Sequence, residues 1–198
     1  MDHPNPKDLN ATIEWARNII ANPDMYLVLD SETTGLGQKD IIVQIGIIDP
    51  STNIILDTLI RPTSRKTIPR EASSIHGITI DMLEKAPTFV DIYPKFKRII
   101  RNKELVIYNA KFDTQLIVQT AVLEGVKEDF KIDAHCAMLA YSMYIGEWSS
   151  YHGNYNYQKL PSGDHTAIGD CKATLDVINK MAITEFIEIP KKWWQLGK

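Results

Sequence analysis

The order of its apolar segments is the feature that most limits how this chain can fold. Met25–Leu29 is a short apolar run of the kind that forms a buried strand. Ile41–Ile48 and Ile54–Ile60 predict two further strands, joined by a turn at residues 49–53. Because only short links join these three successive strands, we expect an antiparallel meander.

The second half of the chain alternates helices with strands. Apolar side chains recur at three- and four-residue intervals over residues 86–101, which predicts a helix. The other predicted elements are a helix at residues 8–22, a strand at 105–108, a helix at 110–123, a strand at 130–132, and helices at 134–144 and 166–184. Together they predict an α/β fold with a mixed five-stranded sheet, an antiparallel meander plus parallel strands, flanked by helices. This is the layout of ribonuclease H-like folds.

The length of 198 residues favours one domain with a sizeable core. We expect that domain to span residues 1–198, with a helical extension at 1–23 and a C-terminal tail at 185–198. The formal charge of −3 argues against a large basic surface for binding duplexes. Two bound divalent cations would add +4 and bring the total to +1, so the charge does not exclude a nucleic-acid substrate.

The cysteine content bears on metal chemistry and compartment. Cys136 and Cys171 are the only two cysteines, too few for a disulfide scaffold, which favours a reducing environment. A zinc site would have to combine them with His135 and His165, at a spacing that matches no common zinc motif. The N-terminus lacks signal-peptide organisation and no apolar run approaches membrane-spanning length, so we expect a cytoplasmic protein with no membrane partner.

Two acidic side chains follow the first predicted strand. Residues two apart in a strand point to the same face, so Asp30 and Glu32 can project together where the run Met25–Leu29 ends. Two unpaired acids beside an apolar run repel each other, and a bound cation would resolve that conflict. The alternative is that the strand simply ends at Asp30 and that residues 33–37 form a solvated turn.

A third acid, Asp113, lies about one turn into the helix predicted after Asn109, which suits an N-cap position. Its row on that helix continues through Ile117, beside an apolar stripe that we expect to run from Phe112 to Leu123. A half-buried acid needs a partner, and a metal ion or metal-bound water would provide one. The alternative is that the helix dipole alone favours an acid in the first turn.

His165 and Asp170 supply the last motif. Asp170 falls beside an apolar row of the final helix, whereas His165 is five residues earlier and would face elsewhere on a continued helix. We therefore expect His165 in the entering loop, where it can lean over the same site. A neutral imidazole can take a proton from water near pH 7, and carboxylates are ligands that Mg²⁺ or Mn²⁺ prefers. The alternative is an exposed histidine without a role.

Four motifs carry a family resemblance: DSETTGL at residues 30–36, IHGIT at 75–79, YNAKFD at 108–113 and HTAIGD at 165–170. In this order they resemble the DEDDh 3′–5′ exonucleases, the DnaQ-like family, which includes the polymerase III proofreading subunit, RNase T and oligoribonuclease. The resemblance implies release of nucleoside 5′-monophosphates from 3′ ends with two divalent ions, Mg²⁺ or Mn²⁺. The implied metal ligands are Asp30, Glu32, Asp113 and Asp170, with His165 as the general base.

The same resemblance implies a set of substrate contacts: Thr33, Thr34, Gly35, Leu36, His76 and Asn109. His76 has an alternative role as a turn residue before Gly77. The motifs favour DNA with single-stranded or frayed 3′ ends, and a proofreading role would require a separate DNA polymerase partner. RNA 3′-end trimming is the alternative activity, because the sequence does not show whether a 2′-hydroxyl is accommodated. A catalytically inactive nucleic-acid-binding module is the alternative that is not an enzyme.

Three further features have open interpretations. Four cations could steer phosphate toward the site: Arg61, Arg65, Lys66 and Arg70. Residues 146–158 contain four aromatic side chains, which either stack on bases or pack over a neighbouring helix. Lys191, Lys192, Trp193 and Trp194 near the C-terminus either dock a partner or anchor the tail.

Overall fold

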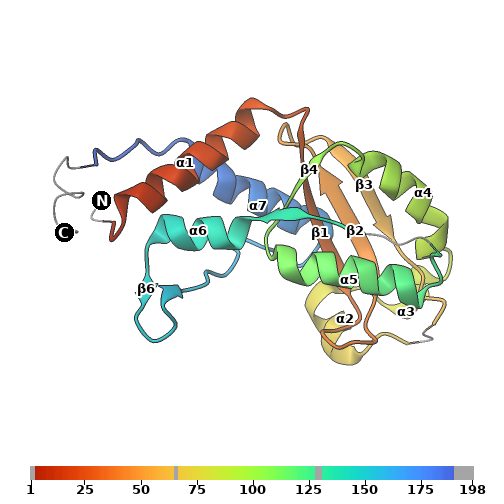
Figure 1. Cartoon of the computed structure of the whole chain (residues 1–198). Coiled ribbons are helices and arrows are strands. Elements are labelled where there is room, and N and C mark those ends of the chain that lie inside the picture. Colours follow the sequence, from red (N-terminus) through yellow and green to blue (C-terminus); the bar gives the residue numbers. More distant parts are fainter. Residues whose placement is uncertain (1–2, 65–66, 128–130, 190–198) are drawn as a thin grey trace.

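A five-stranded mixed sheet forms the centre of the molecule (Figure 1). The structure is a computed structural model and describes residues 3–64, 67–127 and 131–189. In sheet order, the strands are β3 (Ile54–Leu59), β2 (Ile42–Ile48), β1 (Tyr26–Thr33), β4 (Glu104–Ile107) and β5 (Ala134–Cys136). The first three pair antiparallel, and β4 and β5 continue the sheet in parallel with β1. The predicted meander with added parallel strands is confirmed.

Helices cover both faces of this sheet, and a short hairpin projects from one end of the molecule. One face carries α1 (Pro6–Ala21), α6 (Ala137–Ile145) and α7 (Ala167–Ala182). The other carries α4 (Phe89–Ile100) and α5 (Ala110–Leu123). Two short helices, α2 (Arg70–His76) and α3 (Ile80–Leu83), and the hairpin of β6 (Trp148–Ser149) and β7 (Asn154–Tyr155) complete the described elements. Among these helices, none is long and apolar enough to cross a membrane.

The alternation of side chains along β1 decides where its acids point. Val28 belongs to the apolar cluster shared with α1, α6 and α7, whereas Leu27 and Leu29 belong to the cluster shared with α4 and α5. Since side chains alternate between the faces of a strand, Asp30 and Glu32 continue on the α7 side and Ser31 on the α5 side.

The N-terminal helix is packed into the main core. Leu9 and Ile13 of α1 are fully buried in the cluster formed with α6 and α7. The segment after α7 returns to the same helix, because Asn10 exchanges two hydrogen bonds with the backbone of Ile187 at 2.8 and 2.9 Å. Residues 190–198, which include the two terminal tryptophans, lie outside the described residues.

Several predicted boundaries are wrong, for identifiable reasons. Strand β1 continues to Thr33 instead of ending at Asp30, because β2 pairs with its polar end as well. The strand predicted at residues 130–132 is found at Ala134–Cys136, and α6 therefore begins at Ala137 instead of residue 134. Helices α2 and α3 and the β6–β7 hairpin were not predicted, because elements of two to seven residues are too short to show a hydrophobic period.

The buried side of α5 also differs from the predicted stripe. Leu123 is 41% exposed, whereas Asp113, Ile117 and Thr120 are buried. Thr120 is buried because its Oγ1 accepts a hydrogen bond from the backbone amide of Ile42 at 3.0 Å. This row of α5 thus turns toward the sheet and carries Asp113 with it.

Candidate active site

Three acids meet where β1 approaches the start of α7. Asp30 and Glu32 project from the same face of β1, and Asp170 comes from the first turn of α7. One carboxylate oxygen from each of these three residues lies within 4.8 Å of the others. Glu32 is only 8% exposed, so its charge is largely removed from water.

Gly46 makes this meeting possible. It pairs with Asp30 across β1 and β2, and a Cβ atom built on it would lie 2.8 Å from the carbonyl carbon of Ala167. No ordinary side chain fits that space, because carbon atoms in contact prefer separations of about 3.5–4.0 Å. The start of α7 can therefore lie directly on the sheet, which brings Asp170 beside the β1 acids.

The loop before α7 is tied to Asp170. The backbone amides of Asp164 and His165 donate to Asp170 Oδ1 at 2.9 and 3.2 Å. Thr166 is the N-cap of α7, and its hydroxyl accepts from the amide of Gly169 at 3.0 Å. His165 has a left-handed φ of 59° and an exposed side chain that lines the cleft. His165 therefore lies in the loop before α7. The carboxylate of Asp170, which accepts from its backbone amide, is also one of the three clustered acids.

Asp113 reaches the cleft from the opposite face of the sheet. It is 5% exposed, and its Oδ1 accepts a hydrogen bond from Ser31 Oγ at 2.7 Å. Burial raises the pKa of Asp113 to about 7, although the bond from Ser31 acts in the other direction. Asp113 lines the same cleft as the three acids but does not belong to their compact group.

The electrostatics of the site suit a divalent cation. Burial, and then the neighbouring charges of Asp113, Asp170 and Glu32, hold the pKa of Asp30 well above its usual range. Burial, followed by the charges of Asp170 and Asp113, raises the pKa of Glu32 to about 8. These acids resist ionising together unless a cation compensates them. Carboxylate oxygens are the donors that Mg²⁺ and Mn²⁺ prefer, so the donor set fits either ion.

The zinc alternative does not fit the structure. The Cys171 thiol is buried against the carbonyl oxygens of Val28 and Gly46, 3.5 Å from each, and burial raises its pKa. Cys136 Sγ donates to the carbonyl of Tyr108 at 3.3 Å. Within the described part of the chain, neither cysteine belongs to a metal-binding group of three or more candidate ligands.

Two adjoining cavities open over the acids. The larger is a cleft of about 690 Å³, lined by all five predicted catalytic residues together with Asn109, Met138 and residues 157–160. The smaller, of about 540 Å³, lies between the loop that follows β1 and helix α2. Both are lined by Ser31, Glu32 and Phe112, so a bound chain could pass from one to the other across the acidic group.

Thr33, Thr34 and Gly35, which were predicted to contact substrate, use their polar groups mainly to hold the end of β1 and the loop that follows it. Thr34 is 1% exposed, and its hydroxyl donates to Asp40 Oδ1 and accepts from the Ile41 amide. The Thr33 hydroxyl bonds to both backbone groups of Gly35, where φ is +154° and a Cβ would lie 2.7 Å from Asp40. These bonds fix the loop in one shape.

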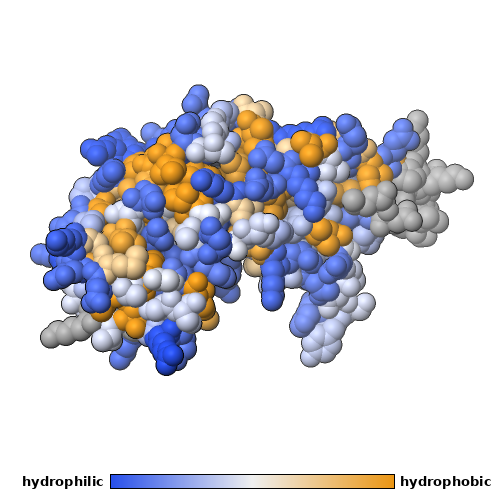
Figure 2. Space-filling model, turned by 180° about the vertical axis from the view of Figure 1, so that it is seen from behind, coloured by the Kyte–Doolittle hydropathy of each residue, from blue (hydrophilic) through white to orange (hydrophobic). Residues whose placement is uncertain are grey.

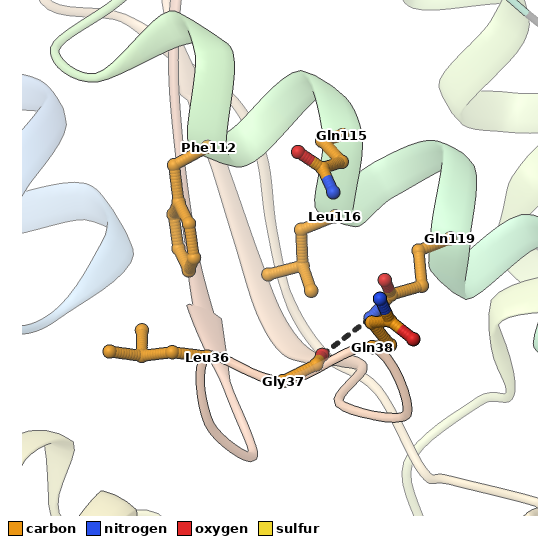
Figure 3. Close-up of a pocket in the computed structure, with 7 residues that line it drawn as sticks. All are labelled: Leu36, Gly37, Gln38, Phe112, Gln115, Leu116 and Gln119. Atoms are coloured by element: carbon orange, nitrogen blue, oxygen red, sulfur yellow. Dashed lines mark hydrogen bonds between the residues drawn. The ribbon is translucent and has the colours of Figure 1, made fainter.

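Leu36 is the side chain that this loop presents, at 85% exposure. Figure 3 shows Leu36 and Phe112 beside a small cavity of about 100 Å³ between the loop and α5. Gln119 of α5 donates to the carbonyl of Gly37 at 3.0 Å, which fastens the loop to the helix (Figure 3). Leu36 and Phe112 also line the 540 Å³ cavity, so both present apolar surface to it.

His76 and Asn109 line different cavities. The Ile78 amide donates to His76 Nδ1 at 3.0 Å, so the proton of a neutral ring sits on Nε2, which donates to the Thr33 carbonyl at 3.2 Å. Burial lowers the pKa of His76, which favours this neutral form. Nε2 thus holds the end of β1, Nδ1 holds the turn that follows α2, and the ring lines the smaller cavity. Asn109 is the N-cap of α5 without a side-chain capping bond, and it faces the larger cleft.

The predicted phosphate-steering cations are only partly described. Arg61 Nε donates to the Ala86 carbonyl at 3.3 Å, and Arg70 is exposed at the start of α2. Arg65 and Lys66 lie outside the described residues. Neither Arg61 nor Arg70 is among the residues that line the two cavities.

Sequence reasoning missed Ser31, Gly46 and Phe112. Ser31 could have been found by alternation, because it faces away from Asp30 and Glu32 toward the helix that carries Asp113. Phe112 was assigned to an apolar stripe, but it is partly exposed and borders both cavities. Gly46 gave no signal, since its role depends on a helix far away in the sequence.

Comparison with known proteins identifies the family. The exonuclease family model RNase_T matches residues 27–178, which include every residue of the acidic group and His165. The chain belongs to this exonuclease family. The match confirms the resemblance of the four motifs to DnaQ-like exonucleases and makes the protein a nuclease hydrolase.

Two relatives place the chain within the DnaQ-like family. It is 39% identical over 175 residues to an uncharacterized exonuclease, CP81, of Escherichia phage 186, covering 80% of this chain and 89% of that protein. It is also 39% identical over 108 residues to the DNA polymerase III epsilon subunit of Buchnera aphidicola subsp. Schizaphis graminum. That match covers 50% of this chain and 46% of the subunit, so the chain spans less than half of that relative.

Solved structures support the DnaQ-like fold. Exonuclease X in complex with 5′ overhanging duplex DNA aligns with a TM-score of 0.51 and 28% identity, covering 81% of this chain and 95% of that chain. E. coli Exonuclease I in complex with a dT13 oligonucleotide aligns with a TM-score of 0.61 and 14% identity, covering 80% of this chain and 41% of that chain. The mixed sheet is thus that of ribonuclease H-like exonucleases.

Proposed function

We propose that this protein is a metal-dependent 3′–5′ exonuclease that releases nucleoside 5′-monophosphates from single-stranded or frayed 3′ ends of DNA. The observation that carries the proposal is the group of Asp30, Glu32 and Asp170, with carboxylate oxygens within 4.8 Å of one another. His165 lines the cleft over this group. Membership of an exonuclease family supports phosphodiester hydrolysis as the chemistry of this cleft.

The acids would hold two divalent ions, Mg²⁺ or Mn²⁺. Asp30, Glu32 and Asp170 are the central ligands, and Asp113 adds a fourth carboxylate from the other face. When bound, such ions supply charge neutralisation at the scissile phosphate and lower the pKa of water. The raised pKa values of Glu32 and Asp113 support this role, because the ionised carboxylates need compensating positive charge.

His165 would act as the general base. It would take a proton from the attacking water, whose oxygen forms the new bond to phosphorus. The bond from phosphorus to the 3′ oxygen breaks, and that oxygen takes a proton from solvent. Asp170 would position this base, because its carboxylate accepts from the backbone amide of His165 itself. Glu32 would help to orient the water from the opposite side of the acidic group.

The two cavities suggest a path for the substrate. The terminal nucleotide would occupy the smaller cavity, against Leu36 and the ring of His76, on the loop fixed by Thr33, Thr34 and Gly35. Leu36 and Phe112 would provide apolar contacts for its base. The scissile phosphate would lie over the acids, and the rest of the strand would leave through the larger cleft past Asn109.

DNA is the proposed substrate, and a DNA polymerase is the proposed partner. The relative named as a polymerase III epsilon subunit supports a proofreading role in which the polymerase is a separate chain. Complexes of Exonuclease X and Exonuclease I with DNA support the choice of DNA over RNA. A purified replicative DNA polymerase from the organism of origin, retained on the immobilised chain and lost with a competing excess of free chain, would support the partnership.

The test of the activity uses 5′-labelled single-stranded DNA with Mg²⁺ or Mn²⁺ and the full chain. We expect products that shorten one nucleotide at a time from the 3′ end, and immediate release of labelled mononucleotide from a 3′-labelled strand. His165→Ala should lower kcat by about 10²- to 10⁴-fold, since general-base catalysis contributes that much. It should leave Mn²⁺ binding, measured by calorimetry, nearly unchanged.

Matched substitutions on α7 provide the control. Asp170→Asn should abolish activity, whereas Asp176→Asn, which alters an exposed acid on the same helix, should not. Label released first from the 5′ end, or internal cuts, would contradict the proposed polarity. Binding of the strand without any cleavage would instead indicate an inactive binding module. Faster cleavage of RNA of the same sequence would assign the substrate to RNA.

A further inference from the structure

The β6–β7 hairpin projects from the body of the molecule (Figures 1 and 2). The hairpin and the residues next to it carry exposed aromatic rings. Tyr151 at its tip is 92% exposed, Tyr157 just after it is 65% exposed, and Trp148 is 53% exposed. Exposed tyrosine rings bury apolar surface readily when a flat partner covers them. The hairpin therefore presents contact surface that the core does not use.

The base of this hairpin is fixed by ring packing and hydrogen bonds. Trp148 packs edge-on against Tyr155, with ring centroids 5.2 Å apart. Tyr155 is buried, and its hydroxyl donates to Asp8 Oδ2 of α1 at 2.7 Å. The Asn156 amide donates to the Glu147 carbonyl at 2.7 Å and closes the ribbon beyond the two short strands. A rigid support lowers the entropy lost when the rings bind a ligand.

The segment that follows the hairpin runs directly into the candidate active site. Tyr157 and the next three residues line the 690 Å³ cleft together with the acids. The Tyr108 hydroxyl donates to the Gln158 carbonyl at 2.9 Å, which fastens this segment to the end of β4. Lys159 brings a positive charge to the same wall. Hairpin and cleft thus form one continuous surface.

This surface lies across the acids from the cavity proposed for the terminal nucleotide. That smaller cavity is lined by α2, and α2 and the hairpin project to the same side of the molecule in Figure 1. A strand with its last nucleotide in the smaller cavity would pass over the acidic group and then meet Tyr157. Its upstream nucleotides would continue toward Tyr151.

We propose that the hairpin formed by residues 147–157 is a stacking platform for the bases of single-stranded nucleic acid upstream of the cleaved nucleotide. The inference rests on the proposed function, because it takes the position of the scissile phosphate from it. Tyr157 and Tyr151 stack on bases of the upstream strand, and Lys159 contacts the backbone phosphate between the cleft and the hairpin. Stacking is tolerant of sequence because every base has an aromatic face. The platform would give the enzyme a preference for long unpaired 3′ ends.

Substrate length tests the platform. The measurement is kcat/KM for a 5′-labelled trinucleotide and a dodecanucleotide of dT, with Mg²⁺. In Tyr151→Ala, the ratio of the dodecamer value to the trimer value should fall by about 5- to 150-fold, the range for loss of one stacked base. Tyr151→Phe keeps the aromatic ring and should keep the ratio of the natural protein.

A control on the same molecule separates stacking from a general loss of exposed apolar surface. Ile183 is 80% exposed at the far end of α7, and Ile183→Ala should leave kcat/KM unchanged for both substrates. If the dodecamer-to-trimer ratio is unchanged in Tyr151→Ala, the hairpin is not a stacking platform, and its exposed rings would instead contact a protein partner. If no variant and not even the natural chain cleaves DNA, the proposed function fails. Fluorescence anisotropy of the labelled dodecamer then tests the platform separately, because Tyr151→Ala must still weaken binding of the dodecamer if the hairpin stacks on its bases.

Discussion

Asp113 and Asp170 both occupy the first turn of a helix and both face the acidic cleft, yet they are held there in different ways. Asp113 is buried and receives the hydroxyl of Ser31 from inside the sheet. Asp170 is partly exposed and receives the amides of Asp164 and His165 from a loop. The α5 side of the site is therefore built into the core, whereas the α7 side joins a proposed metal ligand and the proposed base in one local unit.

The largest difference should appear when each carboxylate is neutralised. Asp170→Asn should weaken Mn²⁺ binding by more than about 100-fold, because even outer-shell partners of a metal typically contribute 10- to 100-fold. Asp113→Asn should weaken it by less, since Asp113 lies outside the compact acidic group. Isothermal titration calorimetry measures both. Equal losses would mean that the cleft closes around the metal with Asp113 as a full ligand.

Gly46→Ala should damage the α7 side selectively. The added Cβ meets the backbone of Ala167, so the start of α7 must move away from the sheet and take Asp170 with it. We expect about a 10- to 100-fold loss of Mn²⁺ affinity and, since overpacking typically costs this much, a loss of about 1–3 kcal/mol of folding free energy. Adding Ala167→Gly removes one of the clashing atoms and should restore part of both. Full affinity in Gly46→Ala would show that this close approach does not position Asp170.

Ser31→Ala should have a smaller effect, confined to the α5 side. Without the hydroxyl, the ionised form of Asp113 loses its hydrogen bond, so the pKa of Asp113 rises further. Mn²⁺ affinity at pH 7 should fall by about 10-fold, the lower end of the range for one bond to a charged group, and recover at pH 9. Ser31→Thr keeps a hydroxyl and serves as the control. A loss that persists at pH 9 would indicate a structural defect instead of a change in protonation.

The last prediction concerns the stability of the metal-free protein. The pKa values of Glu32 and Asp113 are about 8 and 7 in the folded state, well above those of unfolded carboxyl groups near 4. The folded state therefore binds more protons between about pH 4 and 8, so the free energy of unfolding should fall across that window by a few kcal/mol.

Chemical denaturation at several pH values measures this slope. The proposed Mg²⁺ site uses the ionised acids, so Mg²⁺ should raise the unfolding midpoint more at pH 8 than at pH 5. Asp113→Asn removes one of the responsible groups and should flatten the metal-free profile. A metal-free protein that becomes more stable as pH rises from 5 to 8 would show that these acids already have positive partners.

Much of the fold could be predicted because its main elements have strong local patterns. The run before Asp30 and the repeating apolar positions of α4 and α5 were enough to locate the sheet and the helices that follow it. Strand β5 was misplaced because Ala134–Cys136 lies at the sheet edge, where partly buried residues give no apolar run. Its position is decided by pairing with β4, which no local pattern reveals.

The charged residues of the candidate site could be picked out from the sequence, but the contacts that hold them in place could not. Asp30 and Glu32 follow the period of a strand, and His165 could be assigned to a loop by its spacing from Asp170. The sequence could not show that Thr34 is buried or that His76 bonds through both nitrogens, because these contacts cross between elements. It also could not show that Asp113 joins Ser31 instead of the three-acid group.

Gly46 has a consequence for how such enzymes are read and redesigned. It contributes no reactive atom, yet its bare α-carbon allows the close approach of α7 on which the proposed cation site depends. Gly46 matters because it lacks a side chain, so a survey limited to acids, bases and nucleophiles would not detect it. A redesign that keeps the acids and His165 but fills this space would retain the reactive side chains and displace Asp170 from the other acids.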